Sequence, residues 1–257
     1  MDGGKPIRES RDFDVPMAAA HFFYHAGWAD KLEHIVPGGR ARPLGVVGQV
    51  IPWNFPLLML AWKLAPALAM GNTVVVRPAS QNPLAVVELV RIMHEAGFPP
   101  GVVNVVTGST PATGEALVET GDVDMVSFTG STAVGKHIAA RGSEHLKRVF
   151  LELGGKSANI ILDDADLGMV TEGLKFASFM NNGQACVAQT RILASRKNYG
   201  AVVAATPEAR SGRVEALIPL TDPWPNGSWY VRHGDLLGAA CMLLSLLLLG
   251  LRAFTLR

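Results

Sequence analysis

Between residues 44 and 162, short apolar runs alternate with longer segments of helical composition, and Gly or Pro separates most of them. The short runs are rich in Val and Ile, which favours strands that are buried on both faces. Strands and helices alternating at this spacing indicate a doubly wound α/β fold with a mostly parallel sheet, whose carboxyl edge binds ligands. The predicted strands are 44–51, 73–76, 102–106, 125–128, 149–153 and 159–162, and the predicted helices are 57–69, 84–95, 113–120 and 133–141.

The pattern changes on both sides of this region. Residues 1–35 predict helix, and the alternation stops near residue 203. Residues 204–235 are rich in Ala, Gly, Pro and Arg, and an uncharged run of sixteen residues follows at 236–251. A membrane-spanning helix needs at least about 17 apolar residues. The run is therefore compatible with a short membrane segment or with an apolar helix that needs a partner.

Composition and charge exclude several classes of function. The net charge is +1 and the 23 basic residues are scattered, so we expect no nucleic-acid binding. Two cysteines and no Cys/His cluster of ligand spacing predict neither a disulfide framework nor a metal site. The charged N-terminus has no apolar run of the secretory type, and we expect a reducing, cytoplasmic location.

One of the two cysteines lies in an uncharged, amide-rich loop, residues 181–191, directly after the apolar segment 174–180. A substrate can reach a thiol in such a loop, and the neighbouring amide groups can stabilise an anion. Cys186 is therefore a candidate nucleophile. The alternative is that Cys186 is a small buried hydrophobic residue.

A Gly-Ser-Thr turn follows the strand predicted to end at residue 128. Gly130 and Ser131 open a helix that continues through Gly135, and bare N–H groups at a helix N-terminus bind phosphate. The segment resembles a nucleotide-phosphate loop, but His137 stands where Ser or Thr would bind magnesium, which argues against an NTPase. The turn predicts a dinucleotide site or, alternatively, a simple helix cap.

Two further motifs carry polar groups that such chemistry needs. Glu152 lies between two leucines before a Gly pair, where desolvation would raise the pKa of its carboxyl group and suit it to act as a base. The alternative is a strand-edge Glu paired with Lys156. Asn54 lies between two prolines in the turn 52–56, where it is either an oxyanion donor or a helix cap. Together, thiol, base, amide and turn predict oxidation of a carbonyl compound with a nicotinamide cofactor.

Five motifs in this order resemble the aldehyde dehydrogenase superfamily over roughly residues 4–203. The resemblance implies a Rossmann-like domain that binds NAD or NADP, the beginning of a second α/β catalytic domain, an aldehyde substrate and a homo-oligomer. The motifs are PWNFP at 52–56, AWKLAPALAMGNTVVVRPAS at 61–80, FTGSTAVGK at 128–136, LELGGKS at 151–157 and NNGQACVAQTRI at 181–192.

The resemblance also implies a role for individual residues. Cys186 matches the family nucleophile, Glu152 the general base, Asn54 the oxyanion amide and Lys63 the lysine near the nicotinamide and the proton path. The positions that match the cofactor site are Ile51, Trp53, Arg77, Ser80, Gly130, Ser131 and Gly135.

Three departures from the family pattern change these expectations. Arg77 and Ser80 replace the Lys and Glu of K-P-A-E, so that NADP is tolerated as well as NAD. The segment 28–43 is shorter than the usual oligomerisation arm. The later E-[IL]-F-G-P motif is missing.

We therefore expect three regions. Residues 1–152 form an N-terminally incomplete dinucleotide-binding domain, 153–203 begin a catalytic domain with the cysteine loop, and 204–257 form an unrelated tail. Under this interpretation the chain oxidises aldehydes through a Cys thiohemiacetal and thioester, with weak or no turnover by itself. The alternative is a non-catalytic remnant that binds a dinucleotide or a partner, with a membrane tether through 236–251.

Overall fold

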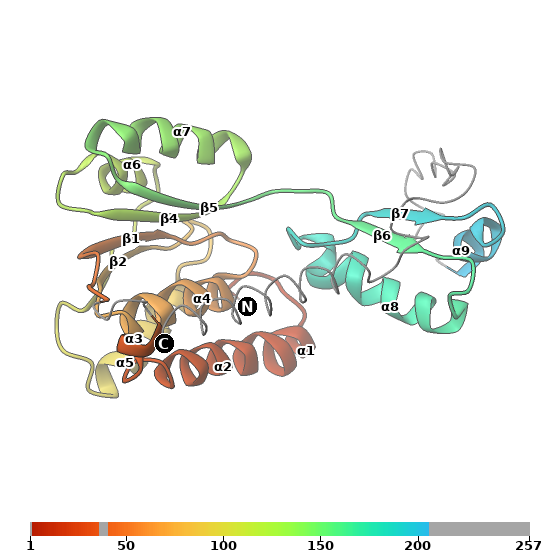
Figure 1. The fold of residues 1–257 in the computed structure, drawn as a ribbon, viewed down its shortest axis with the longest axis horizontal. Coiled ribbons are helices and arrows are strands. Elements are labelled where there is room, and N and C mark those ends of the chain that lie inside the picture. The colour runs from red at the N-terminus through yellow and green to blue at the C-terminus, as the bar shows by residue number, and fades with distance from the viewer. Residues whose placement is uncertain (1, 36–40, 206–257) are drawn as a thin grey trace, which may run out of the picture. The chain divides into compact units, whose positions relative to one another are not determined.

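The computed structural model describes residues 2–35 and 41–205. They form two compact units, which are treated separately below (Figure 1). The first unit comprises the residues up to Ala158 together with Glu172–Arg191. The second comprises Asn159–Thr171 together with the residues from Ile192 on.

A parallel sheet of five strands forms the centre of the first unit, in the order β3-β2-β1-β4-β5. Val74, Val76 and Val126 are fully buried because helices cover both faces of the sheet. The strands are β1 (Val46–Val50), β2 (Thr73–Arg77), β3 (Val103–Val105), β4 (Met125–Gly130) and β5 (Arg148–Leu153).

Helices α2, α4 and α5 lie on one face of the sheet, and α6 and α7 lie on the other (Figure 1). Pro56 occupies the first turn of α4, where its missing N–H costs nothing, and Gly71, with a φ of 76°, follows the end of this helix. The helices are α1 (Ile7–Glu9), α2 (Val15–Ala26), α3 (Leu32–Ile35), α4 (Pro56–Ala69), α5 (Leu84–Glu95), α6 (Ala112–Glu119), α7 (Thr132–Gly142) and α8 (Leu167–Phe179), with a π-helical segment at Ser10–Asp14 and 3₁₀ turns at Ser143–His145 and Met180–Gly183.

Each face of the sheet has its own apolar core. The core under α4 contains Leu60 and Leu64, and it also contains Met180, Ala185 and Ala188 from the cysteine loop. The core under α6 and α7 is built around Leu117, Val126, Phe128 and Ile138. The cysteine loop is thus fixed to the sheet by apolar burial.

The second unit is small. A two-stranded sheet of β6 (Ala158–Ile161) and β7 (Arg191–Ala194) is followed by α9 (Tyr199–Ala205). Side chains just before α9 hold the chain beyond β6: Asn198 Nδ2 donates to the Leu162 carbonyl at 2.8 Å, and Lys197 Nζ donates to the Asp163 carbonyl at 3.2 Å.

The structure confirms the predicted fold class, a mostly parallel α/β sheet with helices on both faces. Every strand and helix predicted between residues 44 and 162 is present, with bounds shifted by at most two residues. The sequence did not predict β7, α8 or α9. The predicted apolar helix at 236–251 lies outside the described residues, and the predicted division at residues 152 and 203 stays a prediction. No helix in the described part of the chain is long and apolar enough to cross a membrane.

Candidate active site at the carboxyl edge of the sheet

The carboxyl ends of four strands meet at one edge of the sheet because all of them run in parallel. Val50 at the end of β1 pairs with Arg77 of β2 and with Phe128 of β4, and Gly130 pairs with Leu153 of β5. The residues that the sequence singled out at the strand ends therefore share this edge, where open α/β sheets bind ligands.

Reciprocal amide hydrogen bonds join the turn after β1 to the cysteine loop. Asn54 Nδ2 donates to the Gln184 carbonyl at 2.8 Å, and Asn181 Nδ2 donates to the Asn54 carbonyl at 2.8 Å. In addition, the Asn181 N–H donates to Glu9 Oε2 at 2.8 Å. The predicted oxyanion amide is thus bonded to the residue two positions before Cys186.

The cysteine loop has an unusual backbone conformation. Asn181, Asn182 and Gly183 have φ values of 53°, 56° and 75°, in the left-handed region that Asn and Gly tolerate best. Beyond them Ala185 is buried in the core, while Cys186 is half-buried and carries a free thiol. The loop therefore exposes part of the cysteine next to a buried anchor, as the nucleophile hypothesis requires.

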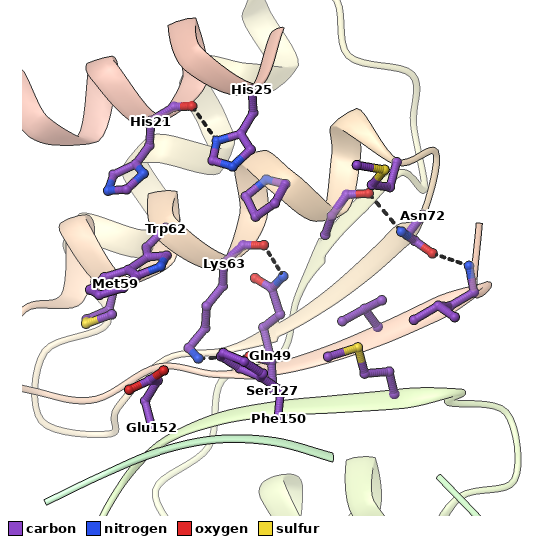
Figure 2. Close-up of a pocket in the computed structure, with 16 residues that line it drawn as sticks. His21, His25, Gln49, Met59, Trp62, Lys63, Asn72, Ser127, Phe150 and Glu152 are labelled. Atoms are coloured by element: carbon purple, nitrogen blue, oxygen red, sulfur yellow. Dashed lines mark hydrogen bonds between the residues drawn. The ribbon is translucent and has the colours of Figure 1, made fainter. Parts of the chain in front are cut away.

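Lys63 of α4 points into a cavity of about 350 Å³ between α2, α4 and the sheet (Figure 2). Its Nζ donates to Ser127 Oγ at 2.8 Å, and its backbone carbonyl accepts from Gln49 Nε2 at 2.9 Å. Burial lowers the pKa of Lys63 to about 8, and the carboxylate of Glu152 opposes this shift without cancelling it. The predicted lysine is thus brought close to the predicted base.

Glu152 lies on the outer strand β5 at the cavity wall (Figure 2), and its side chain is exposed. The predicted desolvation by its two leucine neighbours is wrong. Exposed and half-buried residues alternate along β5, because this strand is the edge of the sheet. Leu151 and Leu153 point to the face covered by α7, so they do not shield Glu152.

The last residue of β4, Gly130, and Gly135 inside α7 have no room for a side chain. A Cβ atom on Gly130 would collide with the Phe128 ring, and one on Gly135 would come within 2.5 Å of Leu153. Ser131 caps α7 by accepting from the Val134 N–H at 3.3 Å. The helix cap that the sequence left as an alternative is therefore present, and it is compatible with a phosphate at the same helix N-terminus.

Arg77 and Ser80 are linked to each other at the end of β2. Arg77 Nη2 donates to Ser80 Oγ at 2.9 Å, and Ser80 Oγ donates to the Gly108 carbonyl at 2.7 Å. The buried Nε of Arg77 finds no hydrogen-bond partner among the described residues. Arg77 Nη2 also donates to the Thr110 carbonyl at 3.3 Å, so the guanidinium group is anchored at the carboxyl edge.

Two of the predicted cofactor residues differ in their exposure. The Trp53 side chain is 47% exposed, so its indole ring is available to a ligand. Ile51 is only 2% exposed and belongs to the core under α4, so in this structure it serves packing.

Three residues that line the same cavity as Lys63 were not predicted from the sequence. Ser127 and Gln49 lie in the middle of strands, and His21 comes from α2, where it stacks on Trp62 with ring centroids 5.9 Å apart. The only sequence signal for Ser127 and Gln49 is that each is a polar residue inside a strand of mainly apolar residues. Across residues 2–35 and 41–205, no group of three or more His, Cys, Asp and Glu residues has the arrangement of a metal site.

Comparison with known proteins decides the family. The profile of the aldehyde dehydrogenase family matches residues 1–216. The chain belongs to this family. Retinal dehydrogenase 2 from Homo sapiens is 47% identical over 236 residues, an alignment that covers 88% of this chain and 46% of the relative. Mitochondrial aldehyde dehydrogenase from Homo sapiens is 50% identical over 208 residues, which are 77% of this chain and 40% of the relative.

Solved structures of aldehyde dehydrogenases have a fold that matches this chain. The NAD⁺ complex of aldehyde dehydrogenase from Bacillus cereus matches with a TM-score of 0.77 and 44% identity, over 82% of this chain and 45% of that one. The chain therefore spans less than half the length of these aldehyde dehydrogenases.

Proposed function

We propose that this chain carries the nucleophile and cofactor residues of an aldehyde dehydrogenase that oxidises an aldehyde to a carboxylic acid with NAD or NADP. The observation that supports this proposal is the pair of hydrogen bonds between the Asn54 turn and the cysteine loop. These bonds connect segments 127 to 130 residues apart in the sequence, and they hold an amide donor beside the loop that carries Cys186.

The chemistry assigned to these residues begins at Cys186. Its thiolate adds to the aldehyde carbon, and the carbonyl oxygen becomes the oxyanion of a thiohemiacetal. One N–H of Asn54 is bonded to Gln184, so the second can donate to this oxyanion together with the backbone N–H of Cys186. The oxyanion would then re-form the C=O bond of a thioester as the carbon loses its hydrogen as hydride, for which a bound NAD(P)⁺ would be the acceptor. Water activated by Glu152 then hydrolyses the thioester to the acid and the free thiol.

The carboxyl edge fits a dinucleotide. The N-terminus of α7, directly after Gly130, offers N–H groups to a pyrophosphate. Arg77 and Ser80 lie at and just beyond the end of the neighbouring strand β2, and Ile51 and Trp53 follow the end of β1. These residues would hold the cofactor.

Because Ser80 carries no charge and Arg77 is cationic, both NAD and NADP are expected to bind, with dissociation constants within about tenfold of each other. Titration calorimetry of each cofactor measures the ratio. The Ser80→Glu variant restores the carboxylate that repels a 2′-phosphate, so it should weaken NADP alone. A wild-type chain that binds only NAD would contradict this assignment.

Turnover by the 257-residue chain is expected to be slow, because Glu152 is exposed and water has free access to it. With propanal and NAD or NADP, formation of reduced nicotinamide should stay at least about 100-fold below a typical enzyme rate of about 10 s⁻¹. The Cys186→Ala variant should abolish the signal. A signal that survives this substitution would contradict the role of Cys186.

A non-catalytic role is the alternative. It is favoured by the exposure of Glu152, while the dinucleotide edge is contained in one compact unit. Cofactor binding in the calorimeter, combined with no reduced nicotinamide even in a single turnover, would support it. The cytoplasmic location and the homo-oligomer expected from the sequence remain proposals.

A further inference from the structure

The cavity beside Lys63 has the size and lining of a small-molecule site. Its volume of about 350 Å³ lies within the range of ligand pockets, and most of its wall is apolar. Val47, Met59, Trp62, Met125 and Phe150 supply much of this wall (Figure 2). An apolar ligand would therefore be desolvated on entering it.

Lys63 is the only lysine or arginine among the residues described as lining the cavity. The residue is 7% exposed, and its Nζ is hydrogen-bonded to Ser127 Oγ at 2.8 Å. The ionisable groups that line the same cavity are Glu152 from β5 and His21 and His25 from α2. Burial and the neighbouring His25 lower the pKa of His21, so this ring is neutral near pH 7 and adds no positive charge.

The state of the amine is what makes this lysine chemically distinctive. With a pKa of about 8, roughly a fifth of the Lys63 side chains are neutral at pH 7.4, compared with about 0.1% for an ordinary lysine. Only the neutral amine is a nucleophile, and desolvated lysines in apolar pockets react with carbonyl compounds.

We propose that Lys63 is a second carbonyl-reactive site, which captures an apolar aldehyde in this cavity as an imine. The Nζ lone pair forms a bond to the aldehyde carbon, and a proton moves from nitrogen to oxygen to give a carbinolamine. The hydroxyl group then leaves as water with one proton, and the C=N bond forms. Glu152 lines the same cavity and lies near the amine end of Lys63 in Figure 2, so its carboxylate can accept and return the proton in these steps. No oxidant or reductant is needed.

The reaction at Lys63 differs from the one proposed for Cys186, although both use Glu152 for proton transfer. The imine forms on a residue of α4 inside the cavity and needs neither the thiol nor the cofactor. The volume suits an aldehyde of about six to ten carbon atoms. Hexanal is therefore a suitable probe.

The test is reductive trapping on the complete 257-residue protein. Hexanal and sodium cyanoborohydride are added at pH 7.5, and peptide mapping by mass spectrometry follows the hexyl group over time. Lys63 should be alkylated at least about tenfold faster than the exposed Lys136 and Lys156, because its free-amine fraction is larger at this pH. The advantage should shrink as the pH approaches 10. Equal labelling of all three lysines, or protection of Lys63, would overturn the proposal.

Variants separate this site from the dehydrogenase chemistry. Lys63→Arg should lose the fast adduct, whereas the matched Lys136→Arg should keep it. Cys186→Ala should also keep it, even where reduced nicotinamide formation disappears. A fast adduct that is lost in Cys186→Ala would assign the reaction to the thiol and contradict the role of Lys63. The wild-type peptide map remains decisive if Lys63→Arg does not fold.

Discussion

The two sides of the candidate site are built very differently. On one side, α4 and the cysteine loop share a core in which Leu60 and Leu64 are fully buried and Ala185 is nearly so. On the other side, Glu152 lies on β5, an edge strand whose Phe150 is 48% exposed. Among the described residues, the loop of the nucleophile is therefore held by packing, whereas the base is positioned by the backbone of its edge strand. Residues assigned to one reaction can thus differ widely in how firmly the fold positions them.

The largest effect that follows from this contrast concerns stability. Leu64→Ala removes a fully buried side chain from the core that also seats the cysteine loop, and it should reduce the free energy of unfolding by about 2–5 kcal/mol. Phe150→Ala on β5 removes a half-exposed ring and should cost less than about 1 kcal/mol. Urea denaturation of both variants measures the difference. Equal losses would show that β5 is as firmly packed as α4.

A smaller effect concerns the pH dependence of stability. Lys63 belongs to the well-packed helix α4 but lines the same cavity as Glu152 of the edge strand β5. Its pKa of about 8 in the folded state lies below the ordinary value of 10.5. The unfolded chain therefore binds more protons between these values, and stability rises with pH from about 8 to 10.5. Relative to Lys63→Met, the wild type should gain about 1–3 kcal/mol across this window.

Denaturant unfolding of both proteins at pH 7.5 and at pH 10 measures this gain. At the lower pH, Lys63→Met should be the more stable of the two, because it buries no charge. A wild type that loses stability relative to Lys63→Met as the pH rises would show that Glu152 dominates over burial.

The smallest effect concerns the cysteine loop itself. Asn181→Ala removes the hydrogen bond to the Asn54 carbonyl and places Ala at a φ of 53°, so it should cost about 1–2 kcal/mol. It should also change the rate at which iodoacetamide alkylates Cys186. Asn182→Ala is the matched control, because Asn182 has nearly the same backbone conformation but an exposed side chain. If both variants alkylate at the wild-type rate, the hydrogen bond does not position the thiol.

The sequence predicted the fold well because its signals are local. Apolar β-branched runs such as Thr73–Arg77 and the Pro56 helix start determine their own structure, and parallel strands then bring their ends together. The candidate site was predicted through motifs that name Cys186 and Asn54, but no local signal shows that Asn54 bonds to Gln184.

The remaining features depend on the tertiary structure. The exposure of Glu152 follows from the position of β5 at the edge of the sheet, and two flanking leucines cannot reveal which face they point to. Likewise, the role of Ser127 becomes visible only in the folded chain, where it accepts a hydrogen bond from Lys63, a residue 64 positions away in the sequence. Both the exposure of Glu152 and the contact of Ser127 depend on neighbours that are distant in the sequence.

The hydrogen bonds between Asn54 and the cysteine loop have a consequence for how the protein responds to solution conditions. Both side chains are neutral amides and both acceptors are backbone carbonyls, so none of these groups gains or loses a proton between pH 5 and pH 10. Salt screens charges, and these two bonds contain no full charge to screen. The two loops therefore stay joined over the whole interval in which Lys63 titrates, and a pH profile of thiol reactivity would report proton transfer rather than the opening of a loop.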